Sequence, residues 1–277
     1  MSTENNDWFE ETHENIALKF RLKQRLFSQQ SDFQKVEVVD TQEHGKLLAH
    51  DGMIMVTEKD EFIYHDMITH VPLFTHPNPK NVLVIGGGDG GTVREVLKHN
   101  SVEKVTMVEI DDMVVEVSKK FIPLTSAKLE DSKVTLIIQD GVKFMKESQE
   151  LFDVVIVDSS EPIGPATPLF NVDFYKDIFN RLSDTGIVVS QGESPYYDMD
   201  MQKVLVKILA EVFPKVHLYN YSNMSYPSGL WSFTYASKGL CPFKDFNPKR
   251  VQQKFQYYNP QIHWGAFMLP QFVFDEH

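Results

Sequence analysis

The stretch Val82-Leu-Val-Ile-Gly-Gly-Gly-Asp-Gly-Gly91 joins a run of branched apolar residues to a glycine-rich turn. The apolar residues of Thr92–His99 then recur at helical spacing, so the sequence predicts a strand, a tight turn and a helix. In the turn, Gly86, Gly88 and Gly91 match the G-x-G-x-x-G spacing of nucleotide-binding loops. Such a unit is typical of α/β folds, whose ligands bind beyond the carboxyl ends of the strands.

More strand-sized apolar runs follow the turn, and amphipathic stretches alternate with them. Because the runs lack polar alternation, we expect strands that are covered on both faces. Alternating strands and helices predict a doubly wound parallel sheet, and the last two segments predict a strand pair joined by the loop 222–229. The runs are Lys104–Val108, Val134–Ile138, Asp153–Val157 and Gly186–Ser190, the amphipathic stretches include Met113–Phe121, Phe174–Leu182 and 204–212, and the final pair is Lys215–Tyr221 with Leu230–Ser237.

The sequence before the glycine turn has a different pattern. From Gln34 to Asp60, β-branched residues alternate with polar residues and turn signals, which predicts a small antiparallel sheet. Phe62 to Phe74 has helical spacing, and His76-Pro-Asn-Pro79 then ends the helix. We therefore expect two domains: residues 1–75 as an N-terminal β-strand domain with a linker helix, and residues 76–277 as a Rossmann-like catalytic domain.

The composition limits the classes of function. The 277 residues carry 27 Lys and Arg against 39 Asp and Glu, a formal charge of −12, and an acidic surface disfavours nucleic acid as a partner. The longest apolar runs fall well short of the roughly 18 to 20 residues that a membrane span needs. The N-terminus is polar rather than signal-like and Cys241 is the single cysteine, so we expect a cytoplasmic protein without disulfides that acts on small molecules.

Two carboxylates narrow the ligand of the glycine turn. Glu109 ends the second strand 23 positions after Gly86, where an acid would accept hydrogen bonds from both ribose hydroxyls. Asp89 lies inside the turn and would repel the pyrophosphate of a dinucleotide. A nicotinamide-dependent oxidoreductase is the rival interpretation, because it would share the glycine turn and Glu109. A sulfonium nucleoside of the S-adenosylmethionine type carries no phosphate. Asp89 would pair with its ammonium if the side arm lacked a carboxylate.

Further acids follow the third and fourth strands. Asp140 and Gly141 would contact the exocyclic amine of an adenine, and an ordinary turn is the alternative reading of the same pair. The loop Asp158-Ser-Ser-Glu-Pro-Ile-Gly-Pro165 holds Asp158 and Glu161 three residues apart on a backbone that proline and glycine restrict. Its side chains are therefore expected to be held over the end of the sheet.

These carboxylates are expected to meet at one rim of the sheet. The strand-end loops contain no Lys or Arg to neutralise them, and such a rim needs a cation. Because three of the acids are assigned to the nucleoside, a polyamine is favoured over a divalent metal, and we predict no metal site. The acids of the rim are Asp89, Glu109, Asp140, Asp158 and Glu161.

Aromatic and histidine side chains complete the set of candidates. Tyr64 and Tyr226 would face a sulfonium or ammonium through their rings. Trp8 or Trp231 would extend that aromatic surface. Two of the histidines, at positions 65 and 70, are five residues apart, about 140° around a helix, so they do not share a face and do not form a metal-binding motif.

Several longer motifs stand in a fixed order along nearly the whole chain. They are Asp51-Gly52, Thr57-Glu-Lys-Asp-Glu-Phe-Ile-Tyr-His65, His76-Pro-Asn-Pro79, Val84-Ile-Gly-Gly-Gly-Asp-Gly-Gly91, Asp158-Ser-Ser-Glu-Pro-Ile-Gly-Pro-Ala166, Tyr226-Pro-Ser-Gly229 and Tyr257-Tyr-Asn259. Because these motifs occur in this order, the chain resembles the spermidine synthases, or polyamine aminopropyltransferases.

The resemblance implies an N-terminal β domain fused to a methyltransferase-like Rossmann domain. It also implies transfer of the aminopropyl group of decarboxylated S-adenosylmethionine, a co-substrate rather than a cofactor, to putrescine, which gives spermidine and methylthioadenosine. A homodimer or homotetramer is implied as well. By position, Asp158 would be the proton acceptor. The acceptor amine would be surrounded by Tyr64, Asp158, Glu161 and Tyr226. With the glycine turn included, the donor would contact Gln34, His65, Gly86, Gly88, Asp89, Glu109, Asp140, Gly141 and Pro165.

Three segments depart from the family pattern. His50-Asp-Gly-Met-Ile-Met55 stands where many relatives have Leu-Asp-Gly-x-x-Gln. Glu161 stands where many have Asp, and Asn223-Met-Ser225 where Ile-Pro-Thr is more frequent. These departures leave the acceptor open among putrescine, cadaverine and agmatine. A putrescine N-methyltransferase that uses S-adenosylmethionine and a non-catalytic polyamine-binding protein are the remaining alternatives.

Overall fold

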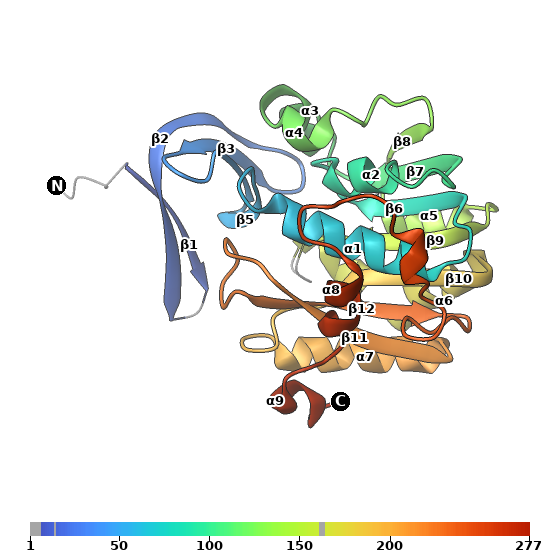
Figure 1. The fold of residues 1–277 in the computed structure, drawn as a ribbon. Coiled ribbons are helices and arrows are strands. Elements are labelled where there is room, and N and C mark those ends of the chain that lie inside the picture. The colour runs from blue at the N-terminus through green and yellow to red at the C-terminus, as the bar shows by residue number, and fades with distance from the viewer. Residues whose placement is uncertain (1–6, 14, 161–163) are drawn as a thin grey trace.

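The computed structural model describes residues 7–13, 15–160 and 164–277, which form two sheets and the helices around them (Figure 1). The strands are β1 (Trp8–His13), β2 (Ile16–Gln30), β3 (Lys35–Thr41), β4 (Lys46–His50), β5 (Met53–Thr57), β6 (Asn81–Gly86), β7 (Lys104–Glu109), β8 (Val134–Ile138), β9 (Phe152–Asp158), β10 (Leu182–Gln191), β11 (Lys215–Ser222) and β12 (Leu230–Ser237). The α-helices are α1 (Glu61–Thr75), α2 (Gly91–Val96), α3 (Asp112–Phe121), α4 (Pro123–Ser126), α5 (Gly141–Glu147), α6 (Val172–Arg181), α7 (Met199–Val212), α8 (Pro260–Ala266) and α9 (Gln271–Phe274). Two 3-10 helices are η1 (Gly164–Leu169) and η2 (Pro248–Arg250).

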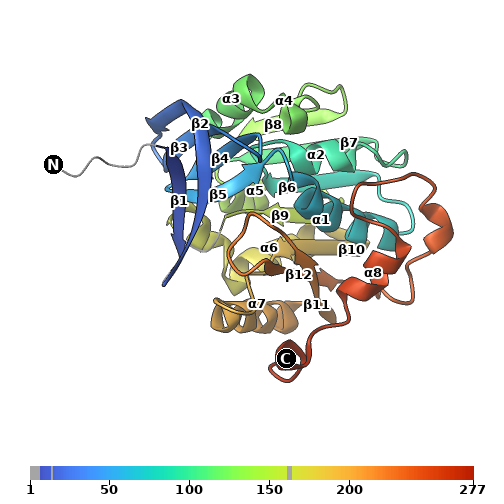
Figure 2. The same ribbon diagram turned by 60° about the vertical axis from the view of Figure 1, so that its left-hand side comes forward.

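The small sheet is antiparallel, as predicted, and has the strand order β1-β2-β3-β4-β5. Figure 2 shows it standing beside the large sheet. Strands β3 to β5 lie in the predicted segment, whereas β1 and β2 precede it and were not predicted. The signal for β2 is a two-residue period, because its apolar residues alternate with polar ones. These apolar residues are Ile16, Leu18, Phe20 and Leu22.

The large sheet confirms the predicted doubly wound arrangement. Its order is β11-β12-β10-β9-β6-β7-β8, and β6 to β10 pair with one another in parallel. At one edge, β11 and β12 form the predicted antiparallel pair, so the sheet as a whole is mixed. Strand β10 begins at Leu182 rather than at the predicted Gly186, with a register shift before Ile187. Because β6 lies between β7 and β9, the glycine turn after β6 marks the switch point where ligands bind.

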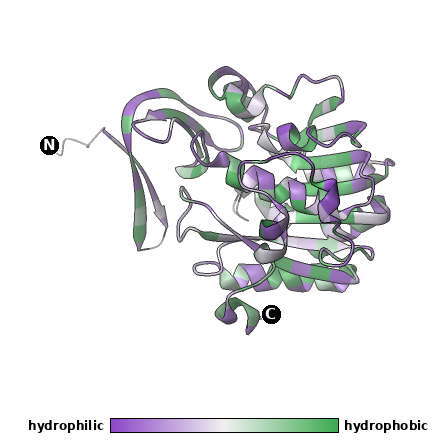
Figure 3. Cartoon of the chain, in the orientation of Figure 1, coloured by the Kyte–Doolittle hydropathy of each residue, from purple (hydrophilic) through white to green (hydrophobic). Residues whose placement is uncertain are grey.

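Helices cover both faces of this sheet. In β6, Val82 and Val84 face a core shared with α1 and α2, whereas Leu83 and Ile85 face a core shared with α5, α6 and α7. Figure 3 shows hydrophobic colours along the strands and mostly hydrophilic colours on the surrounding loops. The unbroken apolar runs of the sequence are therefore explained by burial on both sides.

Helix α3 joins the two sheets. Its Val115 packs in the core of the large sheet, while Val114 and Val117 pack against the small sheet at Val36 and Leu48. Helix α1 follows β5 and packs on the large sheet; the expected domain division between residues 75 and 76 stays a prediction. In the ranges that the model describes, no helix has the length and apolarity needed to cross a bilayer.

Candidate active site

A cavity lies between the small sheet, the N-terminal half of α1 and the carboxyl ends of β6, β7 and β9. Eleven of the predicted site residues line it: Gln34, Tyr64, His65, Gly86, Gly88, Asp89, Glu109, Asp140, Gly141, Asp158 and Tyr226. Glu161 lies outside the described residues, and of Pro165 only the backbone, in η1, is described. The site expected from sequence is thus brought together, apart from these two positions.

The glycine turn is shaped by its neighbours on two sides. Gly86 has a φ of +82°, and a Cβ there would collide with the carbonyl oxygen of Asp158. The next amide, at Gly87, donates to that same carbonyl over 2.8 Å, which ties the turn to the end of β9. At Gly91 a Cβ would overlap the ring of His65. Glycine at these two ends lets β9 and α1 approach closely enough to place Asp158 and His65 beside the turn.

Glu109 is buried at the end of β7 beside Gly88, where the sequence predicts a ribose contact. Its Oε1 accepts the amide hydrogen of Asp111 over 3.0 Å. Burial raises the pKa of Glu109 to about 7, although backbone hydrogen bonds from the following loop lower it in part. The carboxyl group therefore changes charge close to neutral pH, and only its ionised form can accept hydrogen bonds from both hydroxyls of a ribose.

Gln34 lies at the cavity on the side of the small sheet, and Asp111 holds its side chain. Its Nε2 donates to Asp111 Oδ2 over 3.1 Å, and the Ser31 hydroxyl donates to the same oxygen over 2.7 Å. Asp111 Oδ1 in turn accepts the amide hydrogen of Met113 and caps α3. The helix cap that joins the two sheets thus also fixes the position of Gln34.

Asp140 caps the turn that leads into helix α5, and an ordinary turn was the alternative interpretation of this position. Its Oδ1 accepts the amide hydrogens of Val142 and Lys143 over 2.7 and 3.3 Å, which caps helix α5. Gly141 begins that helix, and a Cβ there would lie 2.5 Å from a methyl group of Ile85. The cap holds Asp140 at the cavity, and the adenine contact stays a prediction.

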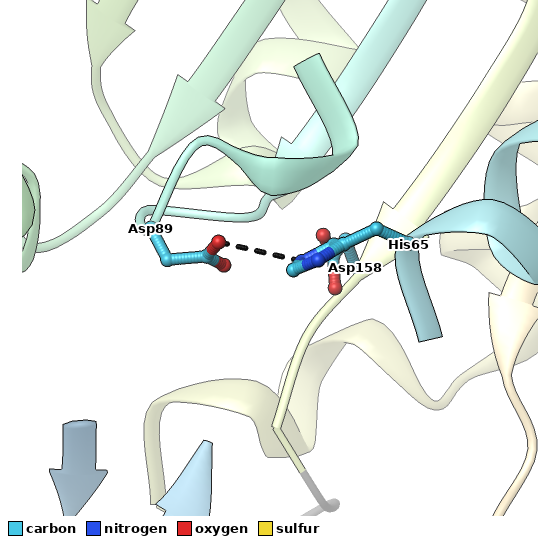
Figure 4. Close-up of side chains that lie close together, drawn as sticks. All are labelled: His65, Asp89 and Asp158. Carbon is cyan, nitrogen blue, oxygen red and sulfur yellow. Dashed lines mark ion pairs between the residues drawn. The ribbon is translucent and has the colours of Figure 1, made fainter. Parts of the chain in front are cut away.

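His65 brings a cationic group to the acidic rim. Its Nε2 lies 3.3 Å from Asp89 Oδ1 (Figure 4). Its Nδ1 lies 2.5 Å from Glu61 Oε2. Burial alone would lower the pKa of His65, but the two carboxylates outweigh it and raise that pKa well above its ordinary value. The loops of the rim do lack Lys and Arg, but a histidine from α1 pairs with Asp89. The expectation that the rim needs a bound cation did not take this histidine into account.

Asp158 is held by two hydroxyl groups. Tyr64 donates to Oδ1 over 2.7 Å and Thr92 donates to Oδ2 over 2.6 Å. Burial and the neighbouring charge of Asp89 raise the pKa of Asp158. One ligand atom each of Asp158, Asp89 and His65 lie within 4.8 Å of one another. A fixed carboxylate with a raised pKa is suited to accept a proton from a bound amine.

The Tyr226 loop presents a ring rather than a hydroxyl group. The Tyr226 hydroxyl donates to the carbonyl of Met55 over 2.6 Å. Asp60, directly before α1, accepts the amide hydrogen of Ser225 over 2.8 Å and its hydroxyl over 3.0 Å. The Tyr226 ring lies 5.2 Å from the ring of Trp231, centroid to centroid. The loop is thus clamped to both β5 and α1.

One of the two tryptophan candidates lies at the cavity. Trp231 lines the cavity with Tyr64 and Tyr226. Trp8 is absent from the cavity wall, and the guanidinium of Arg21 lies 5.9 Å from its ring centroid. Trp8 therefore lies outside the cavity, and the contact of Trp231 with a cationic substrate stays a prediction.

Sequence reasoning missed two acids that line the cavity, Glu61 of α1 and Glu11 of β1. Glu11 of β1 is buried, lines the cavity, and accepts the amide hydrogen of Ile54 at Oε2 over 2.8 Å. In β1 the buried positions are Phe9 and Glu11, so the carboxylate occupies the inward face of an alternating strand. That exception to the apolar pattern was the available signal. His50, one of the family departures, also lines the cavity.

Comparisons with known proteins agree with this geometry. A model of the spermine/spermidine synthase domain matches residues 61–245, and a model of the spermidine synthase tetramerisation domain matches residues 7–58. The chain is 47% identical over 272 residues to the polyamine aminopropyltransferase of Alkaliphilus metalliredigens, with 96% of each chain covered. It is 46% identical over 285 residues to that of Methanocaldococcus jannaschii, with 98% of this chain and 97% of the relative covered.

Two solved structures share the whole architecture. A spermidine synthase crystallised with the transition-state analogue AdoDATO superposes with a TM-score of 0.95 at 41% identity, covering 97% of this chain and 94% of its own. The spermidine synthase of Thermotoga maritima superposes with a TM-score of 0.92 at 40% identity, covering 97% and 93%. The similarity therefore includes both the small sheet and the large one.

Proposed function

The chain belongs to the spermine/spermidine synthase family and is a polyamine aminopropyltransferase, and we propose that it transfers the aminopropyl group of decarboxylated S-adenosylmethionine to putrescine. The observation that carries the proposal is the set of buried acids around one cavity, with Asp158 held by two hydroxyl groups. The products are spermidine and methylthioadenosine. Both substrates are cationic, which suits a protein of net charge −12.

The donor is assigned to the glycine-turn side of the cavity. Glu109 and Gln34 would receive the ribose, while Asp140, Gly141 and Pro165 would lie around the base. Asp89 uses Oδ1 for the amide hydrogen of Gly91, over 2.9 Å, and for His65, and we assign Oδ2 to the ammonium of the aminopropyl arm. Intact S-adenosylmethionine would bring a carboxylate toward Asp89, so the same residue favours the decarboxylated donor.

The acceptor is assigned to the side of Asp158 and the tyrosine rings. Tyr64, Tyr226 and Trp231 offer ring surfaces to a sulfonium or an ammonium. Glu161, in the loop after β9, would also face the amine. For the distal ammonium we propose Glu11, because it is a buried acid on the same cavity that comes from the opposite domain. Replacing Glu11 with Gln should raise the KM for putrescine and leave the KM for the donor unchanged.

The reaction is a displacement at the carbon beside the sulfonium. The lone pair of a neutral amine forms the new C–N bond, the C–S bond breaks, and its electron pair stays on sulfur, which leaves as the neutral thioether. A primary ammonium has a pKa near ~10 and a free aspartate near ~4, so an ordinary carboxylate is a poor base for it. The raised pKa of Asp158 narrows this gap, and Asp158 takes the proton as the new bond forms. The fixed carboxylate also orients the amine for in-line attack.

A competition experiment tests the acceptor. The purified protein is incubated with decarboxylated S-adenosylmethionine and an equimolar mixture of diaminopropane, putrescine, cadaverine, agmatine and spermidine, and the products are identified by mass spectrometry. We expect spermidine to appear first, together with methylthioadenosine. Preferential extension of cadaverine or agmatine would refute putrescine as the acceptor. Methylated putrescine formed from intact S-adenosylmethionine would instead identify an N-methyltransferase.

The small sheet is proposed to mediate self-association, because residues 7–58 match the tetramerisation domain. Strand β1 forms one edge of that sheet, and an edge strand is where a second copy can add. Light scattering of the intact protein should give two or four times the chain mass of 32.0 kDa. A monomer at micromolar concentration would contradict this proposal.

A further inference from the structure

The imidazole of His65 is enclosed by acids on both of its ring nitrogens. Glu61 Oε2 lies 2.5 Å from Nδ1, and Asp89 Oδ1 lies 3.3 Å from Nε2. Asp158 is the third charged group near the ring. A neutral imidazole carries hydrogen on one nitrogen only, so the other nitrogen would point a lone pair at a carboxylate oxygen. With both nitrogens protonated, Nδ1 donates a hydrogen bond to Glu61 and Nε2 forms an ion pair with Asp89. The geometry therefore favours an imidazolium.

Glu61, the acid on the Nδ1 side of His65, is itself held by a residue of helix α2. Arg94 of α2 holds Glu61 through two parallel hydrogen bonds, from Nη1 to Oε1 over 2.9 Å and from Nη2 to Oε2 over 2.8 Å. Nη1 also donates to the carbonyl of Leu124 over 2.9 Å, and Nε donates to Glu95 over 2.7 Å. Such a bidentate pair fixes orientation as well as charge. Glu61 therefore cannot follow His65 if the ring moves.

The ring of His65 has little freedom on its remaining face. A Cβ at Gly91 would overlap the Cε1, Nε2 and Nδ1 atoms of the ring, so only glycine leaves room for it there. The amide of Gly91 donates to Asp89 Oδ1, the same oxygen that faces His65 Nε2. The first residue of α2 thus supports both members of the His65–Asp89 pair. Along this line of contacts, positive and negative charges alternate from Arg94 through Glu61 and His65 to Asp89.

We propose that Glu61 and Arg94 are positioning residues of the aminopropyl transfer, which keep His65 doubly protonated and thereby aim the free oxygen of Asp89 at the donor ammonium. Neither residue needs to touch a substrate, because each acts through His65. The inference rests on the proposed function, since it assigns Asp89 to the ammonium of the decarboxylated donor. It predicts that Glu61 affects the donor and not the acceptor.

The first readout is the protonation state of His65 and does not depend on activity. Nitrogen-15 spectra of histidine-labelled protein distinguish an imidazolium from either neutral tautomer, and the signal that disappears in His65→Gln identifies the residue. We expect both nitrogens of His65 to be protonated at pH 7.5 in the unmodified protein. In Glu61→Gln the ring loses one of its two anions, so the pKa of His65 falls and a neutral ring should appear within the range pH 6 to 9.

The second readout is the division between KM and kcat. Glu61→Gln should raise the KM for decarboxylated S-adenosylmethionine by about tenfold, while the KM for putrescine stays within about twofold. Arg94→Lys keeps the charge but loses the fork, and its effect on the donor should be smaller than that of Arg94→Met. Glu95→Gln is the matched control, because Glu95 contacts the same Arg94 but pairs with His70 instead of His65. It should leave the His65 signal unchanged.

The outcomes separate this inference from the proposed function. A neutral His65 in the unmodified protein, or an unchanged His65 signal in Glu61→Gln, would overturn the role of Glu61 even if spermidine is formed. Equal increases of both KM values would indicate a merely structural effect and would also overturn it. An imidazolium in a protein that transfers no aminopropyl group would refute the proposed function, and the positioning role would be refuted with it.

Discussion

Helix α1 carries an acid and a histidine four residues apart twice, once at the cavity and once in the interior. Glu61 pairs with His65, and Asp66 lies 3.4 Å from His70. Each histidine also meets an acid from the segment 89–95, which is Asp89 for His65 and Glu95, at 3.1 Å, for His70. The residue types of the two clusters are therefore the same, but the acids face both ring nitrogens of His65, whereas Asp66 and Glu95 both face Nε2 of His70.

Their surroundings differ. His65 lines the cavity beside Asp89 and Asp158, whereas His70 is fully buried and is not part of the cavity wall. The ring of Phe255 covers His70 at a centroid distance of 3.8 Å, and His99 Nε2 lies 2.9 Å from its Nδ1. The hydrogen-bonding positions of the interior cluster are thus occupied by other groups of the protein. A cluster of titratable groups becomes a candidate site only where a cavity leaves one of its atoms for a ligand.

The largest expected effect on the cavity side comes from Asp158→Asn. The amide cannot accept the proton of the amine, so kcat should fall by a factor of about 10² or more. Steady-state kinetics with putrescine measure this loss, and titration with methylthioadenosine should show nearly unchanged donor-site binding. Equal losses of turnover and of nucleoside binding would assign Asp158 a structural role, like that of the interior acids.

Asp89→Asn should discriminate between two nucleosides. Decarboxylated S-adenosylmethionine carries an ammonium and methylthioadenosine does not, so the variant should bind the first about tenfold more weakly and the second almost normally. Calorimetric titration of both ligands gives the two dissociation constants. If both weaken by the same factor, Asp89 does not recognise the ammonium, and the cavity cluster would differ less from the interior one than the structure indicates.

The donor site should also respond to pH through Glu109. In the proposed donor site its ionised carboxylate accepts the ribose hydroxyls, and its folded pKa is raised to about 7, so a proton would compete with the ligand below that pH. Methylthioadenosine should therefore bind about tenfold more weakly at pH 6 than at pH 8. Glu109→Gln should remove this slope. A dissociation constant that does not change between pH 6 and pH 8 in the unmodified protein would contradict the assignment.

The interior cluster should affect stability and leave catalysis almost unchanged. Asp66 Oδ2 accepts the amide hydrogens of Tyr257 and Tyr258 over 2.8 and 3.0 Å, which fastens the C-terminal segment to α1. Asp66→Asn should lower the free energy of unfolding by about 1 to 3 kcal/mol, measured as a lower midpoint in thermal unfolding. The kcat/KM of the folded fraction should stay within about twofold. A loss of activity without a loss of stability would break the distinction between the two clusters.

Much of the fold and of the cavity side was predictable from sequence. Parallel strands collect their carboxyl ends at one edge, so the acids that follow β6, β7, β8 and β9 had to meet there. The glycine spacing located the turn, and the angle between His65 and His70 correctly separated their faces. These features depend on local periodicity and on the topology of a doubly wound sheet.

The missing parts depend on contacts between distant segments. Glu11 reaches the cavity from β1, more than forty positions before Ile54, whose amide it accepts. The hydroxyl of Tyr226 is used by the carbonyl of Met55, which no local pattern indicates. Likewise, the pairing of His65 with Asp89 requires knowing that α1 packs against Gly91. Sequence alone predicted the acids of the rim, but it did not predict that a cationic His65 faces Asp89.

The most direct test of the account compares His65→Gln with His70→Gln. The kcat/KM for decarboxylated S-adenosylmethionine is measured at saturating putrescine for both variants, each shown to be folded by circular dichroism. We predict that His65→Gln loses about tenfold or more, because Asp89 loses the partner that orients it, and that His70→Gln stays within about twofold of the unmodified protein. Equal losses in the two variants, or a larger loss in His70→Gln, would contradict the claim that only the cavity cluster handles the charge of the substrates.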